Sequence, residues 1–485
     1  MASDNKRIAK NAILLSFRSL LMLVIGLYSS RVILQALGVD DYGLYGVIGS
    51  MVAMFTILNG VLAAGTSRFL TFELGAKNTD RLRDTFSASF AMHCAFAVVL
   101  FIALETIGLW FLNYKMNIPE SRYFAANVLY QLTIVSCMFS VTQVPYGAII
   151  IAHERMDIYA YVGLAEAIFK LCLIFFLLYV PTSDNLIAYG IIVTSWSILL
   201  QIFYRIFCRK HFPESNLKIC RDKTIYKGML GYSLWDLVGQ FCATGNSQGV
   251  NILINMFFGV AVNAARTVAY QVEGAVSQFI GNFLTSVNPQ ITKSYAAGDL
   301  KRFFQLIFES GKFSYFFLLV FMLPIFIEAE YILKLWLTVV PEYTVLFLRC
   351  ILAISLFRII VRPLITGVHA TGHVRILNLT SGVYSVATYL PFIYLFYKLG
   401  YPVWVCFIVQ GINGIICTIL EIRSLYLEIK FNVIEYLRKV YLVCLIVTIL
   451  ACITPSIVFF CFNDGFLRLI LVCIVSFIST TICAY

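Results

Sequence analysis

Polar side chains recur at helical spacing inside two long apolar segments of this chain. In segment 229–258 the spacing is i, i+4, i+8, i+11 and i+15. At 3.6 residues per turn this spacing puts the polar residues on one face of a helix: Asp236, Gln240, Thr244, Ser247 and Asn251. Segment 261–287 carries a second such stripe, formed by Arg266, Tyr270, Glu273 and Ser277. Polar groups that face hydrocarbon are costly, so each stripe faces either a wet binding cavity or hydrogen-bonding partners on a neighbouring helix.

Basic residues outnumber acidic ones inside the apolar segments, by seven to four. A guanidinium group holds pyrophosphate through two parallel hydrogen bonds, so this excess favours an anionic ligand over a cationic one. Five arginines are the candidates for binding it: Arg266, Arg358, Arg362, Arg31 and Arg18. Arg358 and Arg362 share a helical face, and they repel each other unless an anion or a carboxylate lies between them. Arg18 and Arg31 have an alternative role near the ends of their helix, where long side chains reach the membrane interface.

The other members of the two stripes have supporting roles. Gln240, Asn251 and Tyr270 are candidates for contacts with a polar substrate, with the ring of Tyr270 available to stack on sugars. Asp236 and Glu273 either bind a coupling ion, Na⁺ or H⁺, or serve as counter-ions for the arginines.

Motifs typical of soluble enzymes are absent from the sequence. It contains no G-x-x-x-x-G-K-[ST], G-x-S-x-G or H-E-x-x-H pattern. The 14 cysteines lie almost entirely in apolar segments, without metal-ligand spacing, and we expect free thiols that pack as small hydrophobic groups. The sequence therefore predicts a protein that is not an enzyme and that uses no metal or cofactor.

The elements that carry these residues are expected to be membrane-spanning helices. Of the 485 residues 60% are apolar, and the mean hydropathy is +0.87. About 20 apolar residues cross a bilayer as a helix, and about fourteen such segments fill the chain. They are 11–37, 43–66, 86–112, 122–150, 158–181, 185–207, 229–258, 261–287, 307–328, 344–368, 375–398, 401–422, 437–461 and 465–485.

The distribution of basic residues predicts the orientation in the membrane. With a cytoplasmic N-terminus, 24 of the 36 Lys and Arg residues lie on the inner side and five lie in outer loops. This bias accounts for the net charge of +11 without a nucleic-acid partner. We expect both termini, and the basic segment 208–228, to be cytoplasmic.

Two pairs of segments repeat along the chain at nearly the same shift. SRFLTFELGAKNTDRLRDTF resembles NPQITKSYAAGDLKRFFQLIF at a shift of 221, and VPYGAIIIAHERM resembles RPLITGVHATGHV at a shift of 218. Both halves start on the same side of the membrane, which predicts a parallel repeat around a central cavity. Identities between the paired segments are few, so a chance similarity of loop lengths is the alternative. The expected division is a six-helix bundle over 1–207, a linker over 208–228, a second six-helix bundle over 229–430 and an additional helix pair over 431–485.

The chain resembles the multidrug/oligosaccharidyl-lipid/polysaccharide (MOP) exporter superfamily, and within it the bacterial flippases for O-antigen or capsule repeat units. The N-terminal RIAKNAILLSFRSLLMLVIGLYSSRVILQALGVDDYGLYG carries the resemblance, together with the SRFLTFELG and NPQITKSYAAGD loops. The resemblance implies an all-α, MATE-like (multidrug and toxic compound extrusion) transporter that works by alternating access.

The function expected from these features is translocation of a polyprenyl-pyrophosphate-linked oligosaccharide across the bacterial inner membrane. The partners are then this lipid-linked substrate, the membrane lipids, and the glycosyltransferases and polymerase of polysaccharide synthesis. A cation-coupled drug or metabolite antiporter is the first alternative, and it would favour an acidic cavity. A membrane polymerase or ligase would need a larger outer loop than the 15 or so residues near 329–343, and a scaffold would not need two polar stripes.

Overall fold

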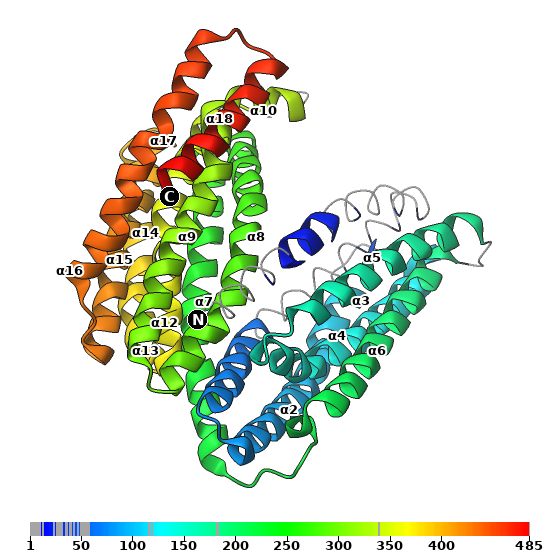
Figure 1. The fold of residues 1–485 in the computed structure, drawn as a ribbon. Coiled ribbons are helices and arrows are strands. Elements are labelled where there is room, and N and C mark those ends of the chain that lie inside the picture. Colours follow the sequence, from blue (N-terminus) through cyan, green and yellow to red (C-terminus); the bar gives the residue numbers. More distant parts are fainter. Residues whose placement is uncertain are drawn as a thin grey trace. The chain divides into compact units, whose positions relative to one another are not determined.

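The computed structural model divides into two compact units, residues 1–233 and residues 234–485. It describes residues 59–114, 118, 120–180, 184–337 and 340–484, together with residue 11, the segment 14–22 and several single positions between 25 and 48. Every regular element in these residues is a helix (Figure 1). The prediction of an all-α chain is confirmed.

The first unit contains a helix over 59–75 and the helices that follow it. They are α2 (Thr79–Ala103), the π-helical η1 (Leu104–Gly108), α3 (Leu109–Tyr114), η2 (Glu120–Arg122), α4 (Tyr123–Ala152), α5 (Met156–Tyr179), α6 (Asn185–His211) and η3 (Pro213–Ser215). Helices α4 and α6 pack side by side along their lengths (Figure 1). Leu129, Tyr130 and Leu186 belong to the core between them.

The second unit contains two long polar helices and a larger set of apolar ones. They are α7 (Lys223–Phe258), α8 (Val260–Ala296), α9 (Leu300–Ile327), α10 (Ala329–Trp336), α11 (Thr344–Ile359), α12 (Arg362–Thr371), α13 (Val374–Leu377), η4 (Asn378–Val383), α14 (Tyr384–Lys398), α15 (Val405–Ile429), α16 (Val433–Tyr436), η5 (Leu437–Tyr441), α17 (Leu442–Cys461) and α18 (Phe466–Ala484). Helices α11, α12 and α9 pack against α8.

The boundary between the units lies inside α7, beyond the expected linker 208–228. The first turns of α7 belong to the first unit because Ile225 and Met229 pack against Ala88 of α2. From Leu234 onward the helix belongs to the second unit. The division into two six-helix bundles remains a proposal. In the structure, α7 crosses the boundary between the two units.

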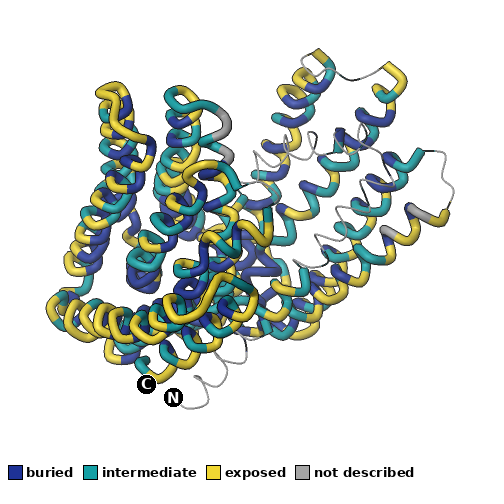
Figure 2. The backbone as a smooth tube through the Cα atoms, turned by 90° about the horizontal axis from the view of Figure 1, so that it is seen from above, coloured by how far each residue is buried: buried dark blue, intermediate teal, exposed yellow. Residues whose placement is uncertain are grey.

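Nine helical segments in the described residues are long and apolar enough to cross a membrane, or ten if α11 and α12 form one span. The nine do not include α7 and α8, which carry the polar stripes. These two helices have 36 and 37 residues, about 55 Å at 1.5 Å per residue, which exceeds the bilayer core. Buried and exposed positions alternate along the helices (Figure 2), and the exposed ones include many large apolar side chains. The chain is a multi-pass membrane protein.

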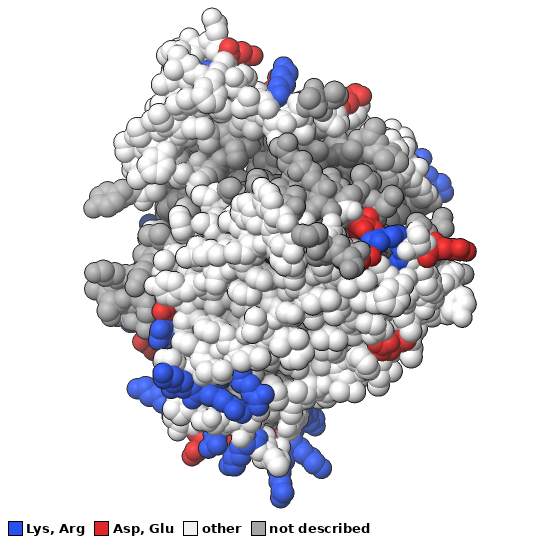
Figure 3. Space-filling view, turned by 90° about the vertical axis from the view of Figure 1, so that its right-hand side faces the viewer, with Lys and Arg blue, Asp and Glu red and all other residues white. Residues whose placement is uncertain are grey.

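The surface drawn in Figure 3 is largely uncharged, with Lys and Arg gathered at one end. In the first unit, the basic segment after α6 contacts the first turns of α2. Arg83 of α2 donates to the carbonyl oxygen of Asn216 at 3.0 Å, and the amide of Lys218 donates to Ser87 Oγ at 3.0 Å. These two hydrogen bonds hold the basic segment after α6 against α2.

The two segments predicted as loops, SRFLTFELG and NPQITKSYAAGD, are largely helical. Residues 59–75 form one helix, and α8 continues to Ala296. The turns lie directly after these helices, where Lys77 and Gly298 both have positive φ, 58° and 74°. Each is followed by an N-cap, Asn78 for α2 and Asp299 for α9. The matching positions differ by 221, which supports the proposed repeat.

The second pair of related segments also ends in matching turns. Glu154, after α4, has φ 58°, and Gly372, after α12, has φ 85°. These positions differ by the predicted 218. A left-handed residue is unusual unless it is glycine, so its presence at both places reflects a shared turn geometry.

The expected helix 344–368 is interrupted. Helices α11 and α12 meet at an angle of 42°, with Ile360 and Val361 between them. Pro363 lies at the start of α12, where its missing N–H and fixed φ are tolerated, and where it cannot continue a helix from before. The prediction of one continuous helix was wrong for this reason.

The C-terminal helices α17 and α18 pack on each other and on α9 (Figure 1). Arg468 of α18 is buried and forms two hydrogen bonds to Glu328, of 2.6 Å and 2.8 Å. Arg468 also pairs with Asp464 and lies over the ring of Phe459. This ion pair joins the C-terminal pair to the end of α9.

Candidate functional site

A cavity of about 300 Å³ lies within the second unit, among α7, α11, α12, η4, α14 and α15. Two predicted residues of α7, Asp236 and Gln240, line it together with Arg358 of α11. The remaining polar lining comes from His369, Asn378, Ser381, Ser385, Cys417 and Glu421. The cavity contains two carboxylates, one arginine and one histidine.

Close packing between α7 and η4 forms one wall of this cavity. The amide of Asn378 donates to the carbonyl oxygen of Trp235 at 2.8 Å. Gly239 permits this approach, because a Cβ at that position would clash with the side chain of Asn378. Gly239 therefore allows α7 and η4 to pack closely at the cavity wall.

Asp236 is buried, and His369 lies close to it. The distance from Asp236 Oδ1 to His369 Nδ1 is 4.0 Å, too long for a hydrogen bond. Among the described residues Asp236 forms no ion pair with an arginine. The arrangement places one buried carboxyl group beside one imidazole at the cavity surface, two groups that can each take up a proton.

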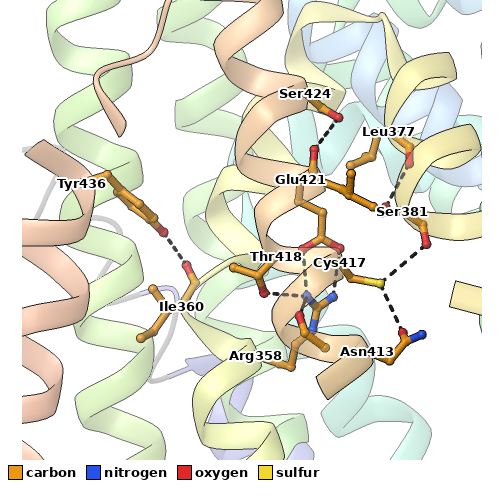
Figure 4. Close-up of polar contacts among 12 residues, drawn as sticks. Arg358, Ile360, Leu377, Ser381, Asn413, Cys417, Thr418, Glu421, Ser424 and Tyr436 are labelled. Atoms are coloured by element: carbon orange, nitrogen blue, oxygen red, sulfur yellow. Dashed lines mark hydrogen bonds and ion pairs between the residues drawn. The ribbon is translucent and has the colours of Figure 1, made fainter. Parts of the chain in front are cut away.

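Arg358 forms a two-point ion pair with Glu421 of α15 (Figure 4). Its Nη1 and Nη2 donate to the two carboxylate oxygens at 2.8 Å and 2.9 Å, and Nη1 also donates to Thr418 Oγ1 at 2.9 Å. A carboxylate therefore holds the guanidinium group, as the repulsion argument required for this position. The sequence did not identify it, because the expected helix ended at 422 and Glu421 was not counted among the charges within spans.

Arg362 is separated from Arg358 by the break between α11 and α12. It is the first residue of α12, its side chain is exposed, and it is not part of the cavity lining. The expectation that Arg358 and Arg362 share one helical face was wrong, because the helix does not continue between them.

A second polar cluster in this unit is centred on Arg266. The guanidinium group is buried, donates to Asn251 Oδ1 of α7 and lies 4.3 Å from the ring centre of Tyr270. Tyr270 is in turn bonded to Gln410 of α15, with 3.2 Å between Tyr270 Oη and Gln410 Nε2. Within the described residues no carboxylate pairs with Arg266. The three predicted residues Arg266, Asn251 and Tyr270 are thus in direct contact.

Glu273 lies further along α8 and accepts hydrogen bonds from two serines. Ser277 Oγ and Ser355 Oγ lie 2.6 Å and 2.8 Å from Glu273 Oε1. Neither Glu273 nor Asp236 is the counter-ion of an arginine in the described part of the chain. For Arg358 that role belongs to Glu421.

The two remaining arginines were predicted in the first helix. Arg18 lies in the described segment 14–22 and packs against Gly163 of α5. Arg31 lies outside the described residues.

Comparison with known structures places this geometry in a known architecture. The crystal structure of a MATE point mutant matches with a TM-score of 0.74 at 14% identity, covering 88% of this chain and 97% of that one. A MATE transporter of Vibrio cholerae matches with a TM-score of 0.70 at 18% identity, covering 90% and 99%. A MOP superfamily transporter from Pyrococcus furiosus matches with a TM-score of 0.70 at 14% identity, covering 88% and 97%. The chain has the MATE fold.

At these identities the matches show the fold alone. No family model and no curated protein matches the sequence. The MATE fold confirms the predicted fold class, and the substrate has to be argued from this chain's own residues.

Six polar residues of the cavity lining were not predicted as site residues: His369, Asn378, Ser381, Ser385, Cys417 and Glu421. A signal for Glu421 was present, because Asn413, Cys417 and Glu421 recur every four residues and form a polar face on α15. Cys417 in that face donates to Asn413 Oδ1 at 3.3 Å (Figure 4). His369 follows the helix break, and no spacing in the sequence relates it to Asp236.

Proposed function

We propose that this MATE-fold chain is a flippase for a polyprenyl-pyrophosphate-linked oligosaccharide, such as an O-antigen or capsule repeat unit. Alternating access carries the head group across the bacterial inner membrane while the lipid tail stays in the bilayer. The N-terminus and the basic end formed by Arg83 and the segment after α6 face the cytoplasm, because basic segments are retained on that side. Glycosyltransferases and a polymerase supply and consume the substrate.

The observation that carries the proposal is the environment of Arg266. A buried guanidinium group normally has a carboxylate partner, because an unpaired buried charge is costly. Arg266 has only the neutral Asn251 and Tyr270 among the described residues. No carboxylate neutralises its positive charge among the described residues, and the planar guanidinium fork matches the oxygens of a phosphate group. Tyr270 supplies a ring beside it for a sugar.

Asp236 and His369 are proposed to couple transport to an ion. A carboxyl group and an imidazole that face one cavity can exchange a proton, and a carboxylate with the oxygens of Gln240 and Asn378 can hold Na⁺. This cavity also favours a second candidate function. Glu421 is paired with Arg358, whereas Asp236 forms no ion pair with an arginine among the described residues, and this carboxylate would suit a cationic drug, so a cation-coupled antiporter is the alternative.

The test is polysaccharide export in cells that depend on this chain, measured together with the amount of protein in the membrane. We expect Arg266→Ala to abolish export at normal abundance. We expect Arg266→Lys to restore it only partly, because an ammonium group keeps the charge and loses the planar grip. The matched control is Arg349→Ala, since Arg349 of α11 is a partly exposed arginine that donates to the carbonyl oxygen of Phe326 at 3.1 Å.

Two results would decide between the candidates. Normal export by abundant Arg266→Ala, with loss of resistance to cationic drugs in Asp236→Asn, would replace the flippase by the antiporter. Loss of export in both the Arg266 and Arg349 variants would show that any arginine in the helices is needed, which would remove the specific role of Arg266.

A further inference from the structure

Two histidines lie in the matching turns of the two units, and each contacts a glutamate. His153 directly precedes the left-handed residue after α4, and its Nε2 contacts a carboxylate oxygen of Glu214 in η3. His373 directly follows the left-handed residue after α12, and its Nδ1 lies 2.8 Å from Glu428 Oε2. Each unit therefore carries a His–Glu pair beside the same kind of turn.

Each pair joins two parts of its own unit that are distant in the sequence, 61 residues apart in the first unit and 55 in the second. Glu214 follows α6, and Glu428 lies in the last turn of α15. In the proposed repeat, α6 and α15 are the sixth helix of each bundle, and the two turns follow the fourth. Each pair thus fastens the turn after the fourth helix to the end of the sixth, on the side proposed to face the cytoplasm.

The pair in the first unit is the better shielded of the two. The ring of His153 stacks on Phe212 with 4.4 Å between ring centres, and the side chains of His153 and Glu214 are 26% and 13% exposed. Burial raises the pKa of Glu214, but hydrogen bonds, that with His153 foremost, lower it by more, so this pKa lies below its usual range. Glu214 is therefore ionised near neutral pH, and the imidazole is the group that titrates.

The other titratable groups around this pair have contacts of their own. Arg155, in the same turn, donates to Asp157 at 3.0 Å. The thiol of Cys208, which interacts with Glu214, donates to a backbone carbonyl oxygen of α4 at 3.6 Å. Glu154, beside His153 in the chain, is a second carboxylate in the turn, and it also favours a protonated imidazole.

The pair in the second unit is more open to water. The side chain of His373 is 70% exposed and that of Glu428 is 18% exposed. The nearby Arg375 of α13 lies over the ring of Trp235, 5.0 Å from its centre. Water and salt weaken an exposed ion pair, so this contact is expected to be the weaker of the two.

We propose that the two His–Glu pairs are proton-operated latches, each fixing the turn after the fourth helix of its unit to the end of the sixth. An imidazole takes up a proton between about pH 5 and 8. The protonated ring adds an ion pair to the hydrogen bond, so it holds the carboxylate more strongly than the neutral ring does. The added stability is present at low pH and is lost as the pH rises. Acidification therefore tightens this end of each unit.

The experiment is hydrogen exchange of the full-length protein in detergent, measured by mass spectrometry at pH 6 and pH 8. Exchange times are scaled for the intrinsic amide rates at the two pH values. We expect residues 150–158 of wild-type protein to exchange about tenfold faster at pH 8, the factor that corresponds to losing one charge-assisted contact. For residues 369–376, with the exposed His373, we expect about threefold.

Substitutions in one unit should act on that unit alone. His153→Gln and Glu214→Gln should remove the pH dependence at residues 150–158 and leave it at residues 369–376, and His373→Gln should do the reverse. The matched control is His211→Gln. His211 is an exposed histidine in the last turn of α6, and its Nδ1 lies 3.0 Å from the carbonyl oxygen of Phe207 in its own helix. This variant should keep the pH dependence at both places.

Each outcome has a defined consequence. Loss of the pH dependence only in the unit that carries the substitution supports the latches. Unchanged pH dependence in His153→Gln or Glu214→Gln overturns the latch of the first unit, and unchanged dependence in His373→Gln overturns that of the second. Equal loss in His211→Gln also overturns the first latch, because the effect would then belong to the end of α6 in general. None of these results depends on the transported substrate, so the proposed function stands or falls separately.

Discussion

Replacing Arg358 by alanine should destabilise the second unit, and the pair with Glu421 allows the size of the effect to be worked out. The Glu421 side chain is only 6% exposed, and the two guanidinium bonds are its strongest contacts. Removing one partner of a buried pair costs about 3–5 kcal/mol, because the other charge stays buried and unpaired. The Arg358 side chain is 31% exposed, so water reaches the vacated place and the lower end, about 3 kcal/mol, is expected.

Removing the charge of Glu421 should lower the stability less than removing that of Arg358. Glu421→Gln keeps the side-chain shape and leaves Arg358 with Thr418 Oγ1, so we expect a loss of about 1.5 kcal/mol. The double variant Arg358→Ala/Glu421→Gln removes both charges and should lose about 1 kcal/mol, which corresponds to a coupling energy of about 3.5 kcal/mol.

The assay is unfolding of the purified chain by SDS in mixed micelles, followed by tryptophan fluorescence. The matched control is Lys334→Ala, which breaks the exposed pair with Glu330 and should change stability by less than about 0.5 kcal/mol. A coupling energy near zero between Arg358 and Glu421 would refute the reasoning. So would a stable Arg358→Ala protein, and that result would return Arg358 to the set of anion ligands.

Two further predictions concern the buried ion pair of Arg468 and the orientation in the membrane. Glu328→Ala should lower stability by about 3–5 kcal/mol, more than Asp464→Ala, because Glu328 is buried while Asp464 is exposed; thermal unfolding of the two variants measures the difference. On a cysteine-free background, a membrane-impermeant thiol reagent should label Asp464→Cys from outside the cell and miss Lys218→Cys, and outside labelling of Lys218→Cys would contradict the proposed orientation.

The helices of this chain are predictable from the sequence, and their ends are less so. Runs of about 20 apolar residues located the spans from α2 onward, because the bilayer fixes the minimum length of such a run. Hydropathy does not register where a helix stops beyond the bilayer, so α8 and the helix 59–75 continue through segments predicted as loops. The helix breaks before α12 because of Pro363. The prediction of one helix over 344–368 gave more weight to the apolar residues around this proline than to the proline itself.

The candidate site was predictable only along single helices. The spacing of α7 identified Asp236 and Gln240, which do line one cavity. Contacts between helices depend on packing, so the pairing of Arg358 with Glu421 and the approach of His369 to Asp236 needed the structure. A helical stripe records which face is polar, and it does not record which other helix that face meets.

Counting charges within the spans treats every arginine as equivalent, whereas their partners separate them. Arg468 and Arg358 each meet a carboxylate through two hydrogen bonds, with Glu328 and Glu421, so their charges are already neutralised inside the bundle. Arg266 meets an amide and an aromatic ring. An anionic substrate gains little from an arginine whose charge is already neutralised, because binding would first break the existing pair and leave its carboxylate buried. The basic excess in the sequence therefore supports an anionic substrate only through the arginines that lack a carboxylate, and this makes Arg266, rather than Arg358, the decisive position for the proposed function.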